Sequence, residues 1–333
     1  MEPVRWGIIS TANIGMAKVN PAMQKGGLCD IRAIASRDLA AARKAADRLG
    51  VEKAYGSYEE LLADPDIEAV YNPLPNHLHV PLSIQAADAG KHVLCEKPIA
   101  LNAEEARKLI AARDRNGVLI QEAFMTRTHP QWLKAREIAG DGTIGDVRAI
   151  CCVFSYYNVD PDNVRNMADI GGGALYDIGC YAITMSRFIY DEEPRRVVAI
   201  IERDPTFRTD RLVSAILDYP SGHTIFTVST QLAPYQRVQI LGAKGRVEVE
   251  IPFNAPPDAP TRIFVDDGSR LGDRSAREVA FDVVDQYTIQ GDEFSRAIRT
   301  GAPQAVALEN SIANMAVIDA VFRSAAEGGW VTP

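Results

Sequence analysis

Three polar side chains fall in two short motifs whose residue types suit the movement of a proton on an oxygen. Tyr181 and Asp177 lie four residues apart in GGGALYDIGCY, and Lys97 lies in HVLCEKPIA. A phenol has an unperturbed pKa of about 10, so it needs help to act as a base near neutral pH. A neighbouring lysine cation would lower that pKa and stabilise a developing alkoxide. In a helix, a spacing of four puts Asp177 and Tyr181 on one face, where the carboxylate would fix the proton network.

Each of the three residues also has an ordinary structural interpretation. Lys97 before a proline is commonly a surface residue, Asp177 could be a helix charge, and Tyr181 could be a core tyrosine. The combination of three glycines, a helix start and the separate Glu-Lys-Pro triplet favours a catalytic role for all three. The chemistry that these three residue types suit is the movement of a proton on a substrate oxygen.

The segment STANIG follows an apolar run at the place where a dinucleotide-binding fold carries GxGxxG. Only the third glycine, Gly15, is present. Ala12 adds one methyl group, so the backbone amides can still point at an anion, and the helix N-terminus adds positive potential. The alternative is a strand-to-helix corner without a ligand. The cofactor-binding residues predicted here are Ser10, Thr11, Ala12, Asn13 and Ile14.

The second expected strand ends in AIASRD, where a dinucleotide-binding domain recognises the ribose. Arg37 can offer a planar fork to a 2′-phosphate and Ser36 a hydroxyl, so the pair favours NADP over NAD. Asp38 is better placed as a helix cap. The alternative for Arg37 is a solvated surface charge.

The spacing of apolar runs predicts two kinds of architecture. Up to residue 124, short strands alternate with helical patterns, which is typical of a parallel sheet. The expected strands are 4–10, 31–36, 67–72, 92–96 and 118–124, and the expected helices are 14–25, 39–49, 80–89 and 103–115, with a short turn at 58–62. Ser57 and Glu60 form a capping box for that turn, and Pro21 should kink or split the first helix.

Beyond residue 124, longer strand-like runs are joined by tight turns, which predicts an antiparallel sheet. The runs are 147–157, 195–203, 212–219, 223–232, 237–242 and 245–253, followed by helices at 287–299 and 308–326. The predicted fold is therefore an α/β Rossmann domain with a doubly wound parallel sheet at 1–124. It is followed at 125–333 by an α+β domain on a largely antiparallel open sheet.

Composition narrows the range of partners. The chain of 333 residues has 47% hydrophobic and 24% charged residues, which is ordinary globular usage and leaves little room for disorder. A formal charge of −8 without a clustered basic face argues against nucleic acid or an anionic membrane. The five cysteines include no CxxC pair and are expected to be buried thiols. No apolar stretch is long enough for a membrane span and no signal peptide is evident, so the expected location is the cytoplasm.

Taken together, EKP after a buried strand, the loop NPLPNHLH and GGGALYDIGCY resemble the Gfo/Idh/MocA oxidoreductases. The resemblance covers nearly the whole chain. Tyr181 stands where most members have His. That variant, with RWGIIS, STANIG and the pair Ser36-Arg37, is similar to the branch containing dimeric dihydrodiol dehydrogenase, NADP-dependent D-xylose dehydrogenase, glucose-fructose oxidoreductase and 1,5-anhydrofructose reductase. The resemblance implies NADP(H), a sugar, polyol or cyclic diol substrate, and a cis bond at Lys97-Pro98 that aims the lysine into the active-site cleft.

The resemblance and the position of each residue in the fold predict further site residues. Glu122 is expected to line the nicotinamide ribose, Arg127 to face substrate, and Arg165 and Asn166 to reach either ligand, while Phe154 and Tyr156 could form an apolar wall. The further cofactor-binding residues are Leu74, Asn76, His77, His79, Glu96, Lys97, Glu122 and Arg165, and the substrate-binding residues are Arg127, Phe154, Tyr156, Asn166 and Tyr181. His77 and His79 form an HxH pair, but no third ligand is evident, so no metal site is expected.

The predicted function is therefore NADP(H)-dependent oxidation or reduction at a CH–OH carbon, with Tyr181 as acid/base assisted by Lys97 and Asp177. The family commonly pairs subunits through the outer face of the second sheet, which implies a homodimer or a dimer of dimers. Two alternatives keep the fold. One is an NADP-binding sensor or structural protein without turnover, and the other is a glycosidase that uses the cofactor transiently.

Overall fold

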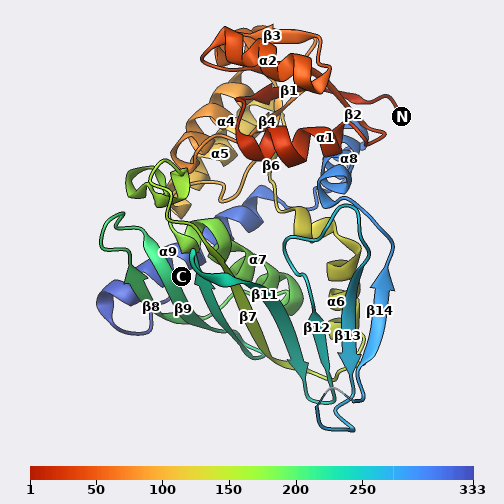
Figure 1. The fold of residues 1–333 in the computed structure, drawn as a ribbon, viewed down its shortest axis with the longest axis vertical. Helices are drawn as coiled ribbons and strands as arrows, with labels where there is room; N and C mark the ends of the chain where they lie inside the picture. The colour runs from red at the N-terminus through yellow and green to blue at the C-terminus, as the bar shows by residue number, and fades with distance from the viewer. Residues whose placement is uncertain (273) are drawn as a thin grey trace. The chain divides into compact units, whose positions relative to one another are not determined.

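The computed structural model describes residues 1–272 and 274–333, and within them the chain forms two compact units. The first unit comprises Met1–Met125 and Asp285–Ile312, and the second comprises Thr126–Val284 and Ala313–Pro333 (Figure 1). No helix of the described residues has the length and apolar character needed to cross a membrane.

The first unit is built on a parallel sheet with the strand order β3-β2-β1-β4-β5-β6. Every neighbouring pair in it is parallel. Its strands are β1 Val4–Ile9, β2 Cys29–Ala35, β3 Lys53–Tyr55, β4 Ala69–Asn72, β5 His92–Cys95 and β6 Ile120–Glu122. This is the doubly wound arrangement that the alternating pattern predicted, and it confirms the α/β class. The short strand β3 was not predicted.

The helices of this unit are α1 Asn20–Met23, α2 Leu39–Leu49, α3 Tyr58–Ala63, α4 His79–Asp88, α5 Ala103–Asn116 and α8 Gln286–Thr300. Helix α2 has the predicted bounds because both ends carry local signals. Asp38 Oδ1 accepts a hydrogen bond of 2.8 Å from the Ala40 amide, and Gly50 ends the helix with φ 66°. The predicted helix at 14–25 is divided into a π-helical turn, Gly15–Val19, and the short α1, in whose first turn Pro21 lies. Proline lacks the amide that an uninterrupted α-helix needs there.

The returning segment with α8 packs on the first unit, although the sequence placed all of 125–333 in the second domain. Trp6 Nε1 donates to Ser295 Oγ at 3.1 Å, and Arg299 Nη2 lies 2.7 Å from Glu68 Oε2. The hydrogen bond from Arg299 is the main cause that lowers the pKa of Glu68 to about 2. These contacts join residues more than 200 positions apart, so no local pattern signals them.

The second unit is built on an eight-stranded sheet with the order β14-β13-β12-β11-β7-β10-β9-β8. Its strands are β7 Val147–Tyr157, β8 Arg196–Arg203, β9 Asp210–Asp218, β10 His223–Ser229, β11 Gln231–Gly242, β12 Arg246–Val249, β13 Thr261–Asp266 and β14 Arg277–Phe281. Most neighbours are antiparallel, as predicted, but β10 runs parallel to β7. The strands β13 and β14 were not predicted. The expected class, an α+β domain on a largely antiparallel sheet, is confirmed.

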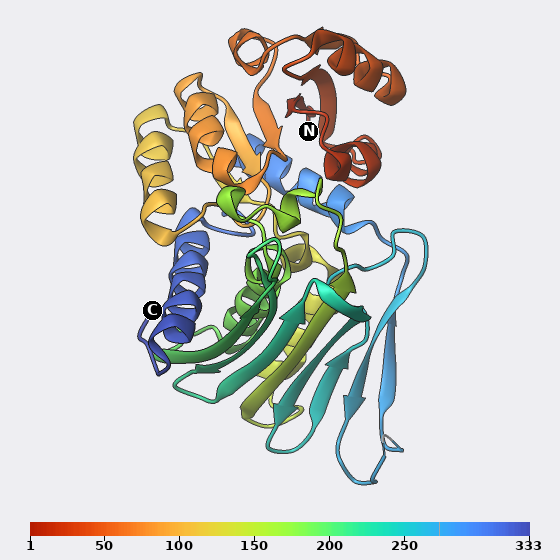
Figure 2. The same cartoon turned by 60° about the vertical axis from the view of Figure 1, so that its left-hand side comes forward.

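The longer helices of the second unit are α6 Pro130–Gly140, α7 Cys180–Tyr190 and α9 Leu308–Glu327, which begins in the first unit. Helices α6 and α7 contact the sheet through β12, β13 and β7, and the Ala199 amide of β8 donates to Ser324 Oγ of α9. Figure 2 shows helices along one face of this sheet and, in the described part of the chain, none across the other. Of the five free cysteines, Cys151 is half-buried and the rest are buried, as predicted.

Candidate functional site

The predicted cofactor residues of the first unit gather at one edge of its parallel sheet. STANIG follows β1, Ser36-Arg37 follow β2, and the loop with Asn76 follows β4. Glu96-Lys97 follow β5, and Glu122 ends β6. The strand order reverses between β1 and β4, and ligands of such sheets bind beside the carboxyl ends of the strands at that reversal. The topology therefore brings these predicted residues together, although they are spread over more than 100 positions of sequence.

The turn after β1 has the backbone shape that the missing glycines would favour. Ser10 has φ 82°, in the left-handed region that a serine adopts at a cost of roughly 1–2 kcal/mol. Its Oγ accepts a hydrogen bond of 3.2 Å from the Ala12 amide, which offsets part of that cost. A Cβ on Gly15 would lie 3.3 Å from Asn20 Nδ2 and 3.5 Å from Tyr71 Cε1, so the retained glycine has a packing role. A turn of this shape before a helix fits the pyrophosphate of a dinucleotide.

The residues after β2 that were predicted to bind the ribose and its phosphate, Ser36 and Arg37, are also suitably placed. Ser36 Oγ accepts from the Asp38 amide at 3.3 Å, and Asp38 caps α2 as predicted. Arg37 is exposed and lies near the Tyr58 hydroxyl, where its charge opposes the burial that raises the pKa of Tyr58. An exposed guanidinium at the end of β2 fits a ribose phosphate.

The loop after β4 separates the two histidines that the sequence assigned to the cofactor. His77 lies in the 3-10 turn Asn76–Leu78, and its Nδ1 is a buried atom with no hydrogen-bond partner among the described residues. His79 is 1% exposed, and its Nδ1 and Nε2 lie 2.7 and 2.6 Å from the carbonyl oxygens of Pro98 and Leu74. Burial lowers the pKa of His79 to about 4. Its ring is therefore enclosed between two loops, and the predicted cofactor contact of His79 stays a prediction.

The loop with Lys97 is held by side chains from several elements. The Tyr71 hydroxyl of β4 donates to Glu96 Oε1 at 2.6 Å, and the Ile99 amide donates to Glu122 Oε1 at 2.9 Å. The Lys97-Pro98 bond is cis, as the resemblance implied, and the Lys97 side chain is half-buried. Glu122, expected to line a ribose, is fully buried and holds the backbone of this loop. Tyr71, which no sequence motif marks, fixes the first residue of the triplet.

In the second unit, the three glycines shape the start of the helix that carries Asp177 and Tyr181. Gly171 and Gly173 have φ 86° and 121°, and a Cβ on Gly172 would lie 2.6 Å from the Arg165 carbonyl oxygen. The helix then begins with a π-helical turn, Leu175–Gly179, before α7. Asp177 therefore lies in a π turn and Tyr181 in the first turn of α7, and their placement on one face stays a prediction.

Asp177 is the centre of a polar network beside the helix. The Tyr156 hydroxyl donates to its Oδ2 at 2.6 Å, and Arg165 Nε lies 2.9 Å from the same oxygen. The charge of Asp177 is the main cause that raises the pKa of Arg165, and the Tyr181 phenol contributes to the same shift. Burial, followed by the charge of Asp177, raises the pKa of Tyr156. Tyr156 thus presents a neutral hydroxyl to the carboxylate, whereas the sequence analysis expected it in an apolar wall.

Tyr181 itself lies among aromatic rings. Its ring centroid is 6.1 Å from that of Phe154, in an edge contact, and 5.3 Å from that of Phe253. Phe154 stacks on Phe253 at 4.8 Å and is only 5% exposed. Phe154 therefore supports the tyrosine ring and leaves little of its own surface for a substrate.

The other predicted ligand contacts of the second unit have structural partners. Arg127, in the 3-10 turn Met125–Thr128, lies over the Phe188 ring at 4.3 Å. Asn166, in the 3-10 turn Val164–Asn166, is 4% exposed and donates to Asn158 Oδ1 at 3.0 Å and the Asp160 carbonyl oxygen at 2.8 Å. Its Nδ2 donors thus hold the loop after β7, which the sequence could not show.

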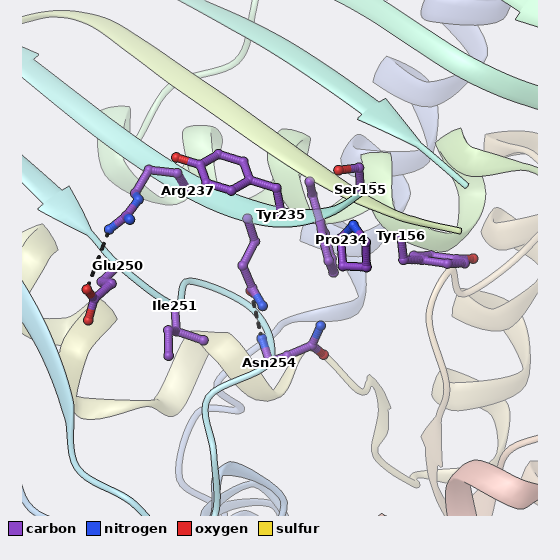
Figure 3. A pocket seen from close by; sticks show the side chains of 10 residues that line it. Ser155, Tyr156, Pro234, Tyr235, Arg237, Glu250, Ile251 and Asn254 are labelled. Atoms are coloured by element: carbon purple, nitrogen blue, oxygen red, sulfur yellow. Dashed lines mark hydrogen bonds and ion pairs between the residues drawn. The ribbon is translucent and has the colours of Figure 1, made fainter. Parts of the chain in front are cut away.

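A cavity of about 630 Å³ lies within the second unit, over the ends of β7 and β11 (Figure 3). Six of its lining residues are Phe154, Tyr156, Tyr235, Arg237, Glu250 and Asn254. Arg237 Nη1 is 3.1 Å from Glu248 Oε1 and 4.0 Å from Glu250 Oε1. The cation in the wall is thus neutralised by carboxylates. Among the described residues, no group of three or more His, Cys, Asp or Glu side chains could hold a metal ion.

The fold and these motifs define an oxidoreductase with a Rossmann domain. Residues 4–124 match the family model described as "Oxidoreductase family, NAD-binding Rossmann fold", and residues 132–248 match the GFO/IDH/MocA C-terminal domain. The chain belongs to the Gfo/Idh/MocA family, which confirms the resemblance seen in the sequence.

Individual relatives agree with this assignment. An uncharacterized oxidoreductase of Rhizobium meliloti is 50% identical over 333 residues, 100% of both chains. The NADP(+)-dependent D-xylose 1-dehydrogenase 2 of Haloferax volcanii is 38% identical over 331 residues, 98% of both chains. Among solved structures, KijD10, a 3-ketoreductase of Actinomadura kijaniata in complex with NADP and TDP-benzene, superposes with a TM-score of 0.89. It is 29% identical, and the alignment covers 97% of this chain and 98% of KijD10.

Proposed function

We propose that the protein is an NADP(H)-dependent oxidoreductase acting on a CH–OH carbon of a neutral sugar, polyol or cyclic diol. NADP, when bound, would accept or supply the hydride. Tyr181 would take up or release the proton of the substrate oxygen, and the Lys97 ammonium would favour the phenolate and the developing alkoxide. Asp177 would keep the proton network in one orientation.

The observation that carries this proposal is the network around Asp177. A half-buried carboxylate beside Tyr181 is held at one oxygen by a phenol and a guanidinium, at 2.6 and 2.9 Å. Titratable groups arranged with perturbed pKa values are typical of sites that handle protons. The charge of Asp177 is the main cause that raises the pKa of Arg165, and it is the second cause, after burial, that raises the pKa of Tyr156.

The cofactor preference rests on Arg37 and Ser36. An exposed guanidinium at the end of β2 can pair with a ribose phosphate, which NADP has and NAD lacks. Arg37→Ala should therefore weaken binding of NADPH by a factor on the order of 10 to 100, as loss of a charge-assisted contact does, and leave NADH nearly unchanged. Fluorescence titration of both cofactors measures this. Equal losses for the two would remove Arg37 from phosphate recognition.

The substrate class rests on the charge of the cavity in the second unit. Arg237 has the Glu248 carboxylate at 3.1 Å, so its charge is balanced before any ligand enters, and Glu250, at 4.0 Å, is itself paired with Arg262. Nucleotide phosphates require cations with free capacity, whereas hydroxyl groups can share polar lining such as Tyr156 and Asn254. This favours a small neutral carbohydrate over a nucleotide-linked sugar.

A substrate screen with optical detection of NADPH tests the proposal. The panel holds D-xylose, D-glucose, 1,5-anhydrofructose, a trans-dihydrodiol and a dTDP-sugar, with NADP or NADPH as the direction requires. We expect steady turnover with at least one neutral member. Tight NADPH binding without turnover of any compound in the panel would favour an NADP-binding sensor. Cleavage of a glycoside without net NADPH would favour the glycosidase.

The outer face of the second sheet supports a homodimer or dimer of dimers. Val198, Ile216, Ile225 and Cys151 are cross-strand neighbours on four adjacent strands, and Ile200 beside them is 77% exposed. An apolar row of this kind on a helix-free face is typical of a subunit interface. Light scattering after size exclusion should give at least twice the chain mass, and a monomer at micromolar concentration would contradict it.

A further inference from the structure

The helix that carries Asp177 and Tyr181 begins at a carboxylate from a different element. Asp210, the first residue of β9, accepts a hydrogen bond of 2.6 Å at Oδ2 from the Leu175 amide, and the Ala174 amide also bonds to its carboxylate. The first amides of a helix have no partner within the helix. Asp210 supplies that partner from 35 residues along the chain.

The third glycine of the GGG segment is explained by the same carboxylate. A Cβ on Gly173 would overlap Asp210 Oδ1, so a side chain at position 173 would displace the carboxylate from the helix start. Gly173 also has φ 121°, which L-residues rarely adopt. Gly173 therefore leaves the space that the Asp210 carboxylate needs to reach the helix start.

Asp210 occupies a site that is costly for a charge. It is 2% exposed, and burial is the main cause that raises its pKa to about 6. The titratable or charged groups that face it are Arg203 of β8, which opposes the shift, and Tyr156 of β7. A buried carboxylate whose main partners are backbone amides is held there by the helix start.

We propose that Asp210 is a positioning residue for the proposed reaction, one that fixes the helix start and thereby the placement of Asp177 and Tyr181. This rests on the proposed function, because Tyr181 is the acid/base only if the protein is a dehydrogenase. The Asp210 carboxylate would act through the backbone amides that it accepts from. Protonation of Asp210 would weaken its charge-assisted bonds to the amides, so catalytic placement is best with the carboxylate ionised.

The pH dependence of stability has the opposite sign. The pKa of Asp210 is higher in the folded chain than the ordinary value of 3.8, so the folded state binds the proton more tightly than the unfolded state. The contribution of this group to stability therefore falls as pH rises from about 4 to about 6. Asp210→Asn, which removes the buried charge, should unfold at the same or a higher temperature at pH 8 while losing activity.

The test compares Asp210→Asn with Asp204→Asn. Asp204 is a matched control, because its carboxylate also accepts backbone amides, those of Thr206 and Phe207 at 2.7 and 2.8 Å, but in the turn between β8 and β9. With the best substrate of the screen, Asp210→Asn should lower kcat on the order of 10- to 100-fold, with KM for NADPH changed less than about twofold. Asp204→Asn should keep kcat within about twofold. Wild-type kcat should fall below about pH 6, and the Asp210→Asn profile should be flat there.

Hydrogen–deuterium exchange gives a readout that needs no turnover. Amides 174–177 should exchange faster in Asp210→Asn than in wild type at pH 7.5, and in wild type their protection should drop at pH 5 after correction for intrinsic rates. The wild-type measurement keeps the test available even if the variant does not fold. The inference would be overturned if amides 174–177 exchanged at the wild-type rate in Asp210→Asn. It would also be overturned if the variant kept the wild-type kcat and the wild-type fall of kcat below about pH 6. If no compound of the substrate screen were turned over, hydrogen–deuterium exchange would still test the Asp210 contact. Failure of the proposed function can therefore be distinguished from failure of the Asp210 inference.

Discussion

The loop of Lys97 carries the proposed stabilising cation and the helix of Tyr181 the proposed acid/base, and the two segments are held in different ways. Residues 96–99 are fixed one at a time, by Tyr71 at Glu96, by His79 at the Pro98 carbonyl and by Glu122 at the Ile99 amide. Each of these contacts comes from a different element, so the loop has several independent supports.

The helix is positioned as a single body. Its start depends on glycines that permit close backbone approach and on one carboxylate, Asp210. Because a helix is rigid along its hydrogen-bonded backbone, a disturbance at residues 173–175 is transmitted to every side chain beyond it. A loop with many supports should tolerate the loss of one better than a helix tolerates the loss of its start.

Removal of the reacting hydroxyl itself should have the largest effect. Tyr181→Phe keeps the ring contacts with Phe154 and Phe253 and deletes only the group that holds the proton. The rate of the chemical step should fall by about 10² to 10⁴, with NADPH binding intact, as measured by single-turnover kinetics and fluorescence titration. Near-normal turnover would remove Tyr181 from the mechanism.

Loss of one support of the loop should have a smaller effect. Tyr71→Phe deletes the hydroxyl that donates to Glu96 at 2.6 Å, and kcat should fall on the order of tenfold because the other contacts remain. Tyr55→Phe is the matched control, because its hydroxyl donates to Asp64 at 2.8 Å away from the Lys97 loop. Both variants should lose similar thermal stability, and only Tyr71→Phe should lose activity. A hundredfold loss would show that the loop, like the helix, depends on a single contact.

The smallest effect is expected at Ser10. This serine has the left-handed backbone conformation before its helix, whereas the corresponding segment of the second unit has glycines with positive φ. Ser10→Ala and Ser10→Gly both lack the hydroxyl, so their difference isolates the backbone conformation at φ 82°. The glycine variant should be more stable than the alanine variant by about 1 kcal/mol in urea unfolding. Equal stabilities would mean that the turn relaxes when the hydroxyl is lost.

Elements with local signals were predictable from the sequence. Helix α2 was predicted with its bounds because Asp38 and Gly50 mark both ends, and β7 because its eleven residues are mostly β-branched, aromatic or otherwise apolar. The π turn before α7 has no such signal in the sequence. The parallel pairing of β10 with β7 was missed because neighbouring runs with tight turns favour antiparallel pairs.

Among the site residues too, those marked by local motifs were predictable and those that depend on distant contacts were not. Motifs placed Lys97, Asp177 and Tyr181, whose roles remain predictions, because chemistry constrains residue type and spacing. The structural contacts of His79 and Glu122 were not predicted, because a motif shows that a polar residue is near the cofactor loop but not which way it faces. Tyr71 and Asp210 could not be found, since an isolated tyrosine or aspartate in a strand looks like many others.

The return of residues 285–312 to the first unit also bears on how the protein is made. During synthesis the Rossmann strands emerge early, yet Trp6 and Glu68 receive their partners Ser295 and Arg299 only when most of the chain has left the ribosome. Chains generally fold by domains in order of synthesis, and here the first domain stays incomplete until the second has been translated. A fragment cut after Met125 would consequently expose the surface that α8 covers, and a dinucleotide-binding module of this protein cannot be separated by a single cut.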